Sequence, residues 1–279
     1  MSYTACKFTL DPFYPFNEIL IAELSDYPFE SFTEEDQIVT AYIPTKDFDA
    51  KILETLNVPD MEGLTCSIET IEIPKENWNQ KWEESFSPVT VSDFCIIRAP
   101  FHEAQANFKY ELIIEPKMSF GTGHHATTQM MIEGMSEIDM TGKSVLDMGS
   151  GTGVLAILAD KMGSVDIKAI DIEDWAFVNI KENIERNSVK QVEAFLGGAE
   201  IIEEINESYD LLLANINKNI LLRDMLVYYK HMNEKSNLLL SGFFKHDADE
   251  IITHAEKLGL NYLKTYINED WCCILFDKS

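Results

Sequence analysis

The stretch KSVLDMGSGTGVLAILADKMG, residues 143–163, constrains the fold more than any other part of the sequence. Ser144–Met148 has the short apolar pattern of a buried strand, three glycines follow at alternate positions, and an apolar helix is expected to begin at Val154. Glycine is needed in such a turn because a side chain would block the approach of a ligand to the backbone, or because the turn requires a positive φ. The exposed amides at the start of the helix favour a polar or anionic group. The stretch therefore predicts a strand, a tight turn and a helix with a ligand at the turn.

Two common phosphate-binding motifs do not fit this turn. A dinucleotide fingerprint, G-x-G-x-x-G, requires glycine three positions after Gly151, where Val154 stands, and the third glycine comes one residue early at Gly153. The segment TGKS at 141–144 would complete a P-loop only with glycine at position 137, which is Glu137. The pattern weakens the dinucleotide interpretation and excludes the P-loop.

The remaining pattern, D-x-G-x-G-x-G from Asp147 to Gly153, resembles the nucleoside-binding turn of class I methyltransferases that use S-adenosylmethionine. An apolar strand within residues 165–176 ends in Asp171, 22 positions after Gly149. A carboxylate at the tip of the second strand can accept hydrogen bonds from both ribose hydroxyls. That role would suit a nicotinamide dinucleotide equally, and Asp171 could instead cap the following helix.

A third buried strand, Asp210–Ala214, ends in Asn215. An amide at the carboxyl end of a parallel strand faces the crevice in which such sheets bind ligands, so Asn215 is a candidate to face the transferring methyl group. The alternative is an asparagine in a surface turn.

The 279 residues, 46% of them apolar, favour two domains. Residues 1–75 show the order β-α-β-β-α-β of a small ferredoxin-like module. Residues 76–92 are expected to form a linker with a helix, on which Trp78 and Trp82 share one face. This pair is expected to dock the helix onto the next domain, and direct contact with a ligand is the alternative. From residue 93 to the C-terminus, long apolar strands alternate with helices, which predicts an open parallel sheet.

The chain is strongly acidic, with 22 basic and 48 acidic residues and a formal charge of −26. Residues 1–75 contain 4 basic and 15 acidic side chains. Like charges repel, so a nucleic-acid backbone is a poor partner and a basic protein a better one, although the acidity could serve solubility alone. No window approaches the roughly 18 apolar residues of a membrane span, and no signal peptide is recognisable, so we expect a cytoplasmic protein. The five cysteines are expected to be reduced and packed inside.

The order and spacing of several motifs resemble a bacterial family, known as PrmA, that methylates large-subunit ribosomal protein eleven. The matching segments run from residue 78 to the C-terminus, whereas the first 75 residues match mainly in size and element order. The segments are WNQKW, FSPVTV, FGTGHHATT, VLDMGSGTG, AIDIEDWA, ENIERN, LLLANI, SGFF and NEDWCCILF.

The resemblance implies a Rossmann-like class I methyltransferase domain preceded by a ferredoxin-like domain that recognises the ribosomal protein. It implies an activity, the transfer of methyl groups from S-adenosylmethionine to lysine or α-amino nitrogens. We expect the chain to work as a monomer. Thr128, Gly149, Asp171 and Asn215 look like the donor-binding positions, and Gly151 follows as part of the same turn. The sequence singles out no general base, so the catalytic residues are left open. Other possibilities are a class I methyltransferase for another protein or a small amine, and an inactive scaffold that binds the donor.

Residues 120–128, FGTGHHATT, are expected to form a flap that leads into a helix and closes over the donor, with Phe120 as apolar cover. Adjacent side chains on a helix diverge by about 100°, so His124 and His125 are not expected to clasp a metal ion. One departure from the family pattern is the segment at 217–219, Asn-Lys-Asn, where small and apolar residues are usual. It puts the acceptor in doubt and leaves donor binding intact. Ser150, where the family often has cysteine, is a milder change.

Overall fold

The computed structural model describes residues 2–74, 83, 86–117 and 120–279. The chain divides into two compact units, residues 1–85 and 86–279. Each is described by itself. The second unit begins before the expected residue 93, because Val89–Val91, placed in the linker by the sequence, forms strand β5 and pairs with β6 of this unit. Trp78 and Trp82, and the linker helix expected around them, lie outside the described residues.

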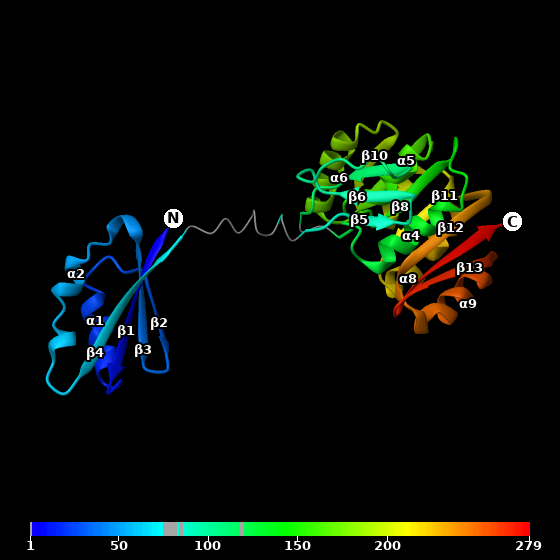
Figure 1. Ribbon diagram of the computed structural model, residues 1–279. Coiled ribbons are helices and arrows are strands. Elements are labelled where there is room, and N and C mark those ends of the chain that lie inside the picture. The colour runs from blue at the N-terminus through cyan, green and yellow to red at the C-terminus, as the bar shows by residue number, and fades with distance from the viewer. Residues whose placement is uncertain (1, 75–82, 84–85, 118–119) are drawn as a thin grey trace. The chain divides into compact units, whose positions relative to one another are not determined.

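The first unit has the expected β-α-β-β-α-β order. Its elements are β1 (Tyr3–Asp11), α1 (Phe16–Leu24), β2 (Ser31–Glu35), β3 (Ile38–Pro44), α2 (Lys51–Glu54) and β4 (Thr65–Ile73). The antiparallel sheet has the order β2-β3-β1-β4, and both helices cover one face of it (Figure 1). The second helix is short: 3-10 turns at Thr45–Asp47 and Val58–Asp60 flank a single α-helical turn.

The second unit is built on a seven-stranded sheet with the order β10-β9-β8-β11-β12-β14-β13. All neighbouring pairs from β10 to β12 are parallel, and β14 is antiparallel to both of its neighbours. The strands are β8 (Ser144–Met148), β9 (Asp166–Asp171), β10 (Val192–Leu196), β11 (Tyr209–Asn215), β12 (Met232–Phe244), β13 (Leu260–Asn268) and β14 (Trp271–Lys278). This arrangement confirms the predicted Rossmann-like class.

Helices cover both faces of this sheet (Figure 1). One apolar layer contains α4 (Ala126–Ser136), α5 (Val154–Lys161) and α6 (Asp174–Asn187), and the other contains α7 (Ala199–Ile205), α8 (Lys218–Lys230) and α9 (Ala248–Leu258). A small sheet of β5, β6 (Cys95–Arg98) and β7 (Tyr110–Ile113) joins the first layer through apolar residues such as Ile97 and Leu112. The sheet strands carry nearly continuous apolar runs because both of their faces are buried.

Two asparagines of α6 complete the backbone pairing of the segment that leads to the flap. β7 pairs with β6 on one side. On its other side, Asn187 accepts from the N–H of Ile113 at 2.9 Å and donates to the same residue's carbonyl at 2.7 Å. One turn earlier, Asn183 accepts from the N–H of Glu115 and donates to the carbonyl of Thr152. The amide side chains thus supply the donor and acceptor that a neighbouring strand would supply.

None of the helices in the described ranges combines the length and the apolar character that a bilayer span requires. The five cysteines are free thiols, and all but Cys66 are buried.

Candidate active site

The predicted site residues gather where β8, β9 and β11 end. β8 is hydrogen-bonded to β9 on one side and to β11 on the other, so the chain winds in opposite directions from this strand. In open α/β sheets, such a switch point leaves a crevice at the carboxyl ends of the strands, and ligands bind there. Gly149, Asp171 and Asn215 lie at or directly after these three strand ends.

The glycine turn has the backbone geometry that the sequence predicts. Gly149, Gly151 and Gly153 all have positive φ, between 57° and 78°. A Cβ on Gly149 would lie 2.3 Å from Cγ2 of Ile216, and a Cβ on Gly151 would lie 2.3 Å from the backbone oxygen of Phe120. Only glycine therefore fits both the conformation and the space at these positions.

Asp171 connects the glycine turn with the start of α6. Its Oδ2 accepts from the backbone N–H of Gly151 at 2.8 Å, and its Oδ1 accepts from the N–H of Glu173 at 3.0 Å. This second bond lies just before the helix, and no side chain in the described ranges caps α6, so the helix-capping alternative is not confirmed. A carboxylate offers about four acceptor positions, so both oxygens keep capacity for the hydroxyls of a ligand.

The segment after residue 119 is fastened over the glycine turn. The N–H of Thr152 donates to the carbonyl of Phe120 at 3.0 Å, and the Thr152 hydroxyl donates to the carbonyl of Gly121 at 2.7 Å. Phe120 itself remains 51% exposed and lines the cavity described below. The predicted flap is therefore in contact with the predicted ligand-binding turn.

Asn215 and Thr128 meet although they are 87 positions apart. Nδ2 of Asn215 lies 3.4 Å from the Thr128 hydroxyl, at the start of α4. The other amide atom, Oδ1 of Asn215, is buried and has no hydrogen-bond partner among the described residues. Thr128 is buried and is not among the residues that line the cavity, so its contact with the site runs through Asn215.

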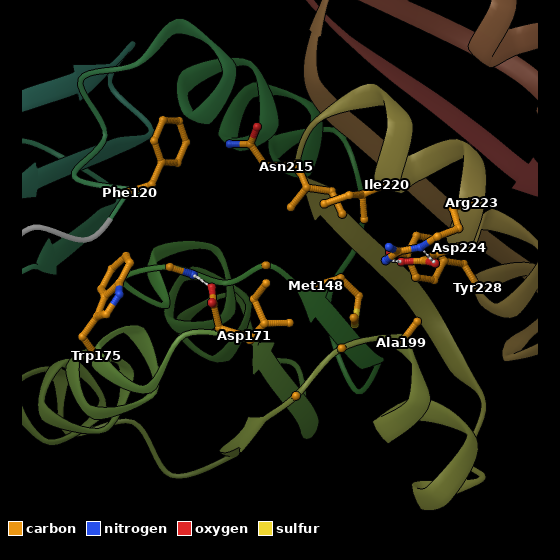
Figure 2. A pocket seen from close by; sticks show the side chains of 16 residues that line it. Phe120, Met148, Asp171, Trp175, Ala199, Asn215, Ile220, Arg223, Asp224 and Tyr228 are labelled. Atoms are coloured by element: carbon orange, nitrogen blue, oxygen red, sulfur yellow. Dashed lines mark hydrogen bonds and ion pairs between the residues drawn. The ribbon is translucent and has the colours of Figure 1, made fainter.

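The cavity has a volume of about 250 Å³, and Figure 2 shows it from close by. Phe120 and Trp175 stand at one end and Arg223, Asp224 and Tyr228 at the other, with Asp171 and Met148 between them. The lining residues are Phe120, Met148, Gly149, Gly151, Asp171, Ile172, Trp175, Gly197, Gly198, Ala199, Asn215, Ile216, Ile220, Arg223, Asp224 and Tyr228. Four of the five predicted site residues are in this set.

The carboxyl group of Asp147 lies beneath the glycine turn. It is buried, and its Oδ2 accepts from the N–H of Ala156 in the first turn of α5 at 3.2 Å. Burial is the main cause that raises the pKa of Asp147 to about 7; the N–H of Ala156 opposes this shift, and the charge of Asp171 adds to it. Ser150 fits the same turn, because its hydroxyl donates to the carbonyl of Asp147 at 2.7 Å.

The adjacent histidines have separate partners. His124 bonds to the hydroxyl of Thr122 and to the carbonyl of Ser87, and Nδ1 of His125 accepts from the N–H of Thr127 at the start of α4. Within the described ranges, no group of three His, Cys, Asp or Glu side chains could hold a metal ion.

The unusual segment at 217–219 has local structural roles. Oδ1 of Asn217 accepts from the N–H of Ile220 and caps α8. Nζ of Lys218 lies 2.6 Å from Asp247 and 3.0 Å from Glu250, so its charge is paired with carboxylates near the start of α9. Neither residue lines the cavity.

Sequence reasoning missed the part of the cavity that α6 and α8 contribute. Ile172 and Trp175 follow Asp171 too closely to form a motif of their own, and Arg223, Asp224 and Tyr228 belong to no recognised pattern. One available signal was the spacing of Asp224 and Tyr228, which are four apart and so share a face of the helix.

The comparisons agree with this fold. The model of the family described as "Ribosomal protein L11 methyltransferase (PrmA)" matches residues 17–279. A ribosomal protein L11 methyltransferase of Porphyromonas gingivalis is 40% identical over 261 residues, which cover 93% of this chain and 90% of the relative. Another, from Phocaeicola vulgatus, is 37% identical over 280 residues and covers 99% of both chains.

Solved structures show the same fold. A ribosomal protein L11 methylase from Lactobacillus delbrueckii subsp. bulgaricus superposes with a TM-score of 0.64 at 24% identity, covering 70% of this chain and all of its own. A methyltransferase from Pyrococcus furiosus gives a TM-score of 0.51 at 18% identity over 60% of this chain and 89% of its own. The family match, which spans both units, is what assigns the chain: it belongs to the ribosomal protein L11 methyltransferase (PrmA) family.

Proposed function

We propose that this chain transfers methyl groups from S-adenosylmethionine to amino groups of ribosomal protein L11. The observation that carries the proposal is one cavity lined by the glycine turn, the Asp171 carboxylate and the Asn215 amide, in a member of the PrmA family. The glycine positions form a cradle that a Cβ would fill, and Oδ1 of Asn215 is a buried acceptor with no partner among the residues that the structure describes. Both features fit an adenosyl sulfonium with an amine beside it.

The donor supplies an activated methyl group on a positively charged sulfur. The residues of this chain bind and orient it. Asp171 accepts from the ribose hydroxyls, Gly149 and Gly151 allow close approach to the backbone, and Thr128 acts by orienting Asn215 through their side-chain contact. Alignment is the main contribution that a protein can make to an in-line displacement.

Asn215 is proposed to receive the acceptor amine. Its Oδ1, for which the described part of the chain offers no partner, can accept a hydrogen bond from a nitrogen that approaches the methyl group. A lysine ammonium must first lose a proton, and removing it from water lowers its pKa from an unperturbed value of about 10.4. Phe120 and Trp175, at one end of the cavity, offer apolar surface to the bound molecules. We assign no dedicated general base.

The acceptor is proposed to be a basic protein that the first unit helps to capture. With 4 basic and 15 acidic side chains in its first 75 residues, this part of the chain attracts positive charge and repels a nucleic-acid backbone. Ribosomal proteins are made and assembled in the cytoplasm, so we place the reaction there, with one chain acting as a monomer and with no membrane involved.

The test is transfer of tritiated methyl groups to ribosomal proteins purified from cells that lack this chain. We expect one dominant labelled protein, L11, with label on lysine or α-amino nitrogens. Label on a different protein or a small amine would reassign the acceptor. Binding of the donor without any label would favour a scaffold. The Asp171→Ala variant serves as the control that reduces donor binding.

A further inference from the structure

We propose that Asp224, held by Arg223, and Tyr228 together recognise the 6-amino edge of the donor's adenine ring and select adenine over other purines. This inference rests on the proposed function, because it assigns one end of the same cavity. All three residues come from α8, and they lie at the end of the cavity away from Phe120 and Trp175 (Figure 2).

The layout of the cavity directs the purine toward α8. Asp171, the proposed ribose partner, lies between the two ends. We place the base in the part of the cavity that extends from Asp171 toward α8. Met148 and Ile220 lie along that direction in Figure 2 and offer apolar surface to the faces of an aromatic ring. Beyond them the lining becomes polar, as the edge of a purine requires.

Asp224 has the chemistry to accept an amine. Its side chain is buried, and Arg223 donates to both oxygens, from Nε to Oδ1 at 2.6 Å and from Nη2 to Oδ2 at 2.7 Å. This pairing fixes the orientation of the carboxylate. Since a carboxylate offers about four acceptor positions, two remain for hydrogen bonds from a ligand. An exocyclic amine donates, whereas a carbonyl oxygen at the same ring position would face a second acceptor.

Tyr228 provides an independent observation that points to a ligand. It is 1% exposed, lines the cavity, and has no hydrogen-bond partner for its hydroxyl among the described residues. Buried hydroxyls are normally paired, because an unpaired one destabilises the folded protein. A ring nitrogen or amine of the purine would supply the missing partner. Asp224 and Tyr228 are one helical turn apart and so face the same ligand.

The first experiment compares two nucleosides that differ at this edge. Calorimetric titration of the full chain with S-adenosylhomocysteine and with S-inosylhomocysteine, its 6-oxo analogue, should show at least about tenfold tighter binding of the adenine compound, because a lost bond to a charged group leaves the carboxylate facing an acceptor. In Asp224→Asn, whose amide can donate to the 6-oxo group, this preference should shrink or reverse. Equal binding of the two compounds by the wild type would overturn the inference.

The second experiment separates recognition from packing. Tyr228→Phe removes only the hydroxyl, so the melting temperature of the free protein should stay the same or rise. Its affinity for S-adenosylhomocysteine should fall by about three- to tenfold. Tyr209→Phe is the matched control, because Tyr209 is also fully buried and is absent from the cavity lining. Unchanged affinity in Tyr228→Phe would contradict the inference. A wild-type chain that binds neither compound would instead overturn the proposed function.

Discussion

The backbone N–H of Gly151 donates a hydrogen bond of 2.8 Å to Oδ2 of Asp171, a residue 20 positions later in the chain. The same carboxylate accepts from the N–H of Glu173. The side chain that we assign to the ribose therefore also fixes the glycine turn relative to the start of α6. The site is preorganised in this way, which reduces the cost of ordering it when a ligand binds.

Replacing Asp171 should affect both binding and folding. In Asp171→Ala we expect donor affinity to fall by about 1.5–3 kcal/mol, the range for hydrogen bonds to a charged group. The free energy of unfolding should also fall, because two backbone N–H groups lose their acceptor. Calorimetry with S-adenosylhomocysteine and urea denaturation measure the two effects. Asp166→Ala, at the other end of β9, is the control. Undiminished donor affinity in Asp171→Ala would remove its ribose role.

Gly151→Ala should be far more harmful than Gly142→Ala. Both glycines have positive φ, so each substitution has a strain cost of about 1–2 kcal/mol. A Cβ at Gly142 meets nothing within 4 Å, whereas at Gly151 it would collide with the backbone oxygen of Phe120. We expect Gly151→Ala to lose at least about 1 kcal/mol more in urea denaturation, in line with overpacking elsewhere. Similar losses of unfolding free energy in the two variants would show that the Phe120 backbone leaves room for a side chain at position 151.

Asn187→Ala should destabilise the second unit. The substitution leaves both the N–H and the carbonyl of Ile113 without the partner that the amide supplies. We expect the free energy of unfolding to fall by about 1–3 kcal/mol. Asn187→Asp should have an intermediate effect, because it keeps the acceptor for the N–H of Ile113 and loses the donor to the Ile113 carbonyl. Stability equal to that of the wild type in both variants would mean that β7 needs no partner on that side.

The buried carboxyl of Asp147 should make stability depend on pH. Its pKa, raised by burial to about 7 in the folded chain, is about 3.9 in an unfolded one, so the folded state binds more protons between these values. The stabilising contribution of the Asp147 carboxyl to the free energy of unfolding is present in full below about pH 4 and is lost as the pH rises through about 7. At about 1.4 kcal/mol per pKa unit, it amounts to a few kcal/mol. Unfolding free energies from pH 4 to 8 should fall more steeply in the wild type than in Asp147→Asn, and parallel curves would contradict the shift.

The local features of the second unit were predictable from sequence. Strand β8 occupies the predicted residues Ser144–Met148 and helix α5 begins at the predicted Val154, because an apolar run, three glycines and an apolar helix each specify their own conformation. Strand β11 is one residue longer at the start than predicted and ends at Asn215, as expected. The parallel sheet follows from the alternation of such units.

What the sequence did not predict depends on tertiary contacts. β5 is a three-residue strand that exists because β6 pairs with it. The cavity end formed by Arg223, Asp224 and Tyr228 arises from the way α8 packs against the sheet, and no local pattern specifies that packing. The segment at 217–219 put the acceptor in doubt, but the charge of Lys218 is paired with Asp247 and Glu250 near the start of α9.

The measurement that tests the central claim most directly is a titration of the full chain with S-adenosylhomocysteine, followed by one with NAD. The cavity at the ends of β8, β9 and β11 should bind one equivalent of the adenosyl compound, and NAD should give no comparable heat. Saturable binding of NAD, with none of S-adenosylhomocysteine, would contradict the account.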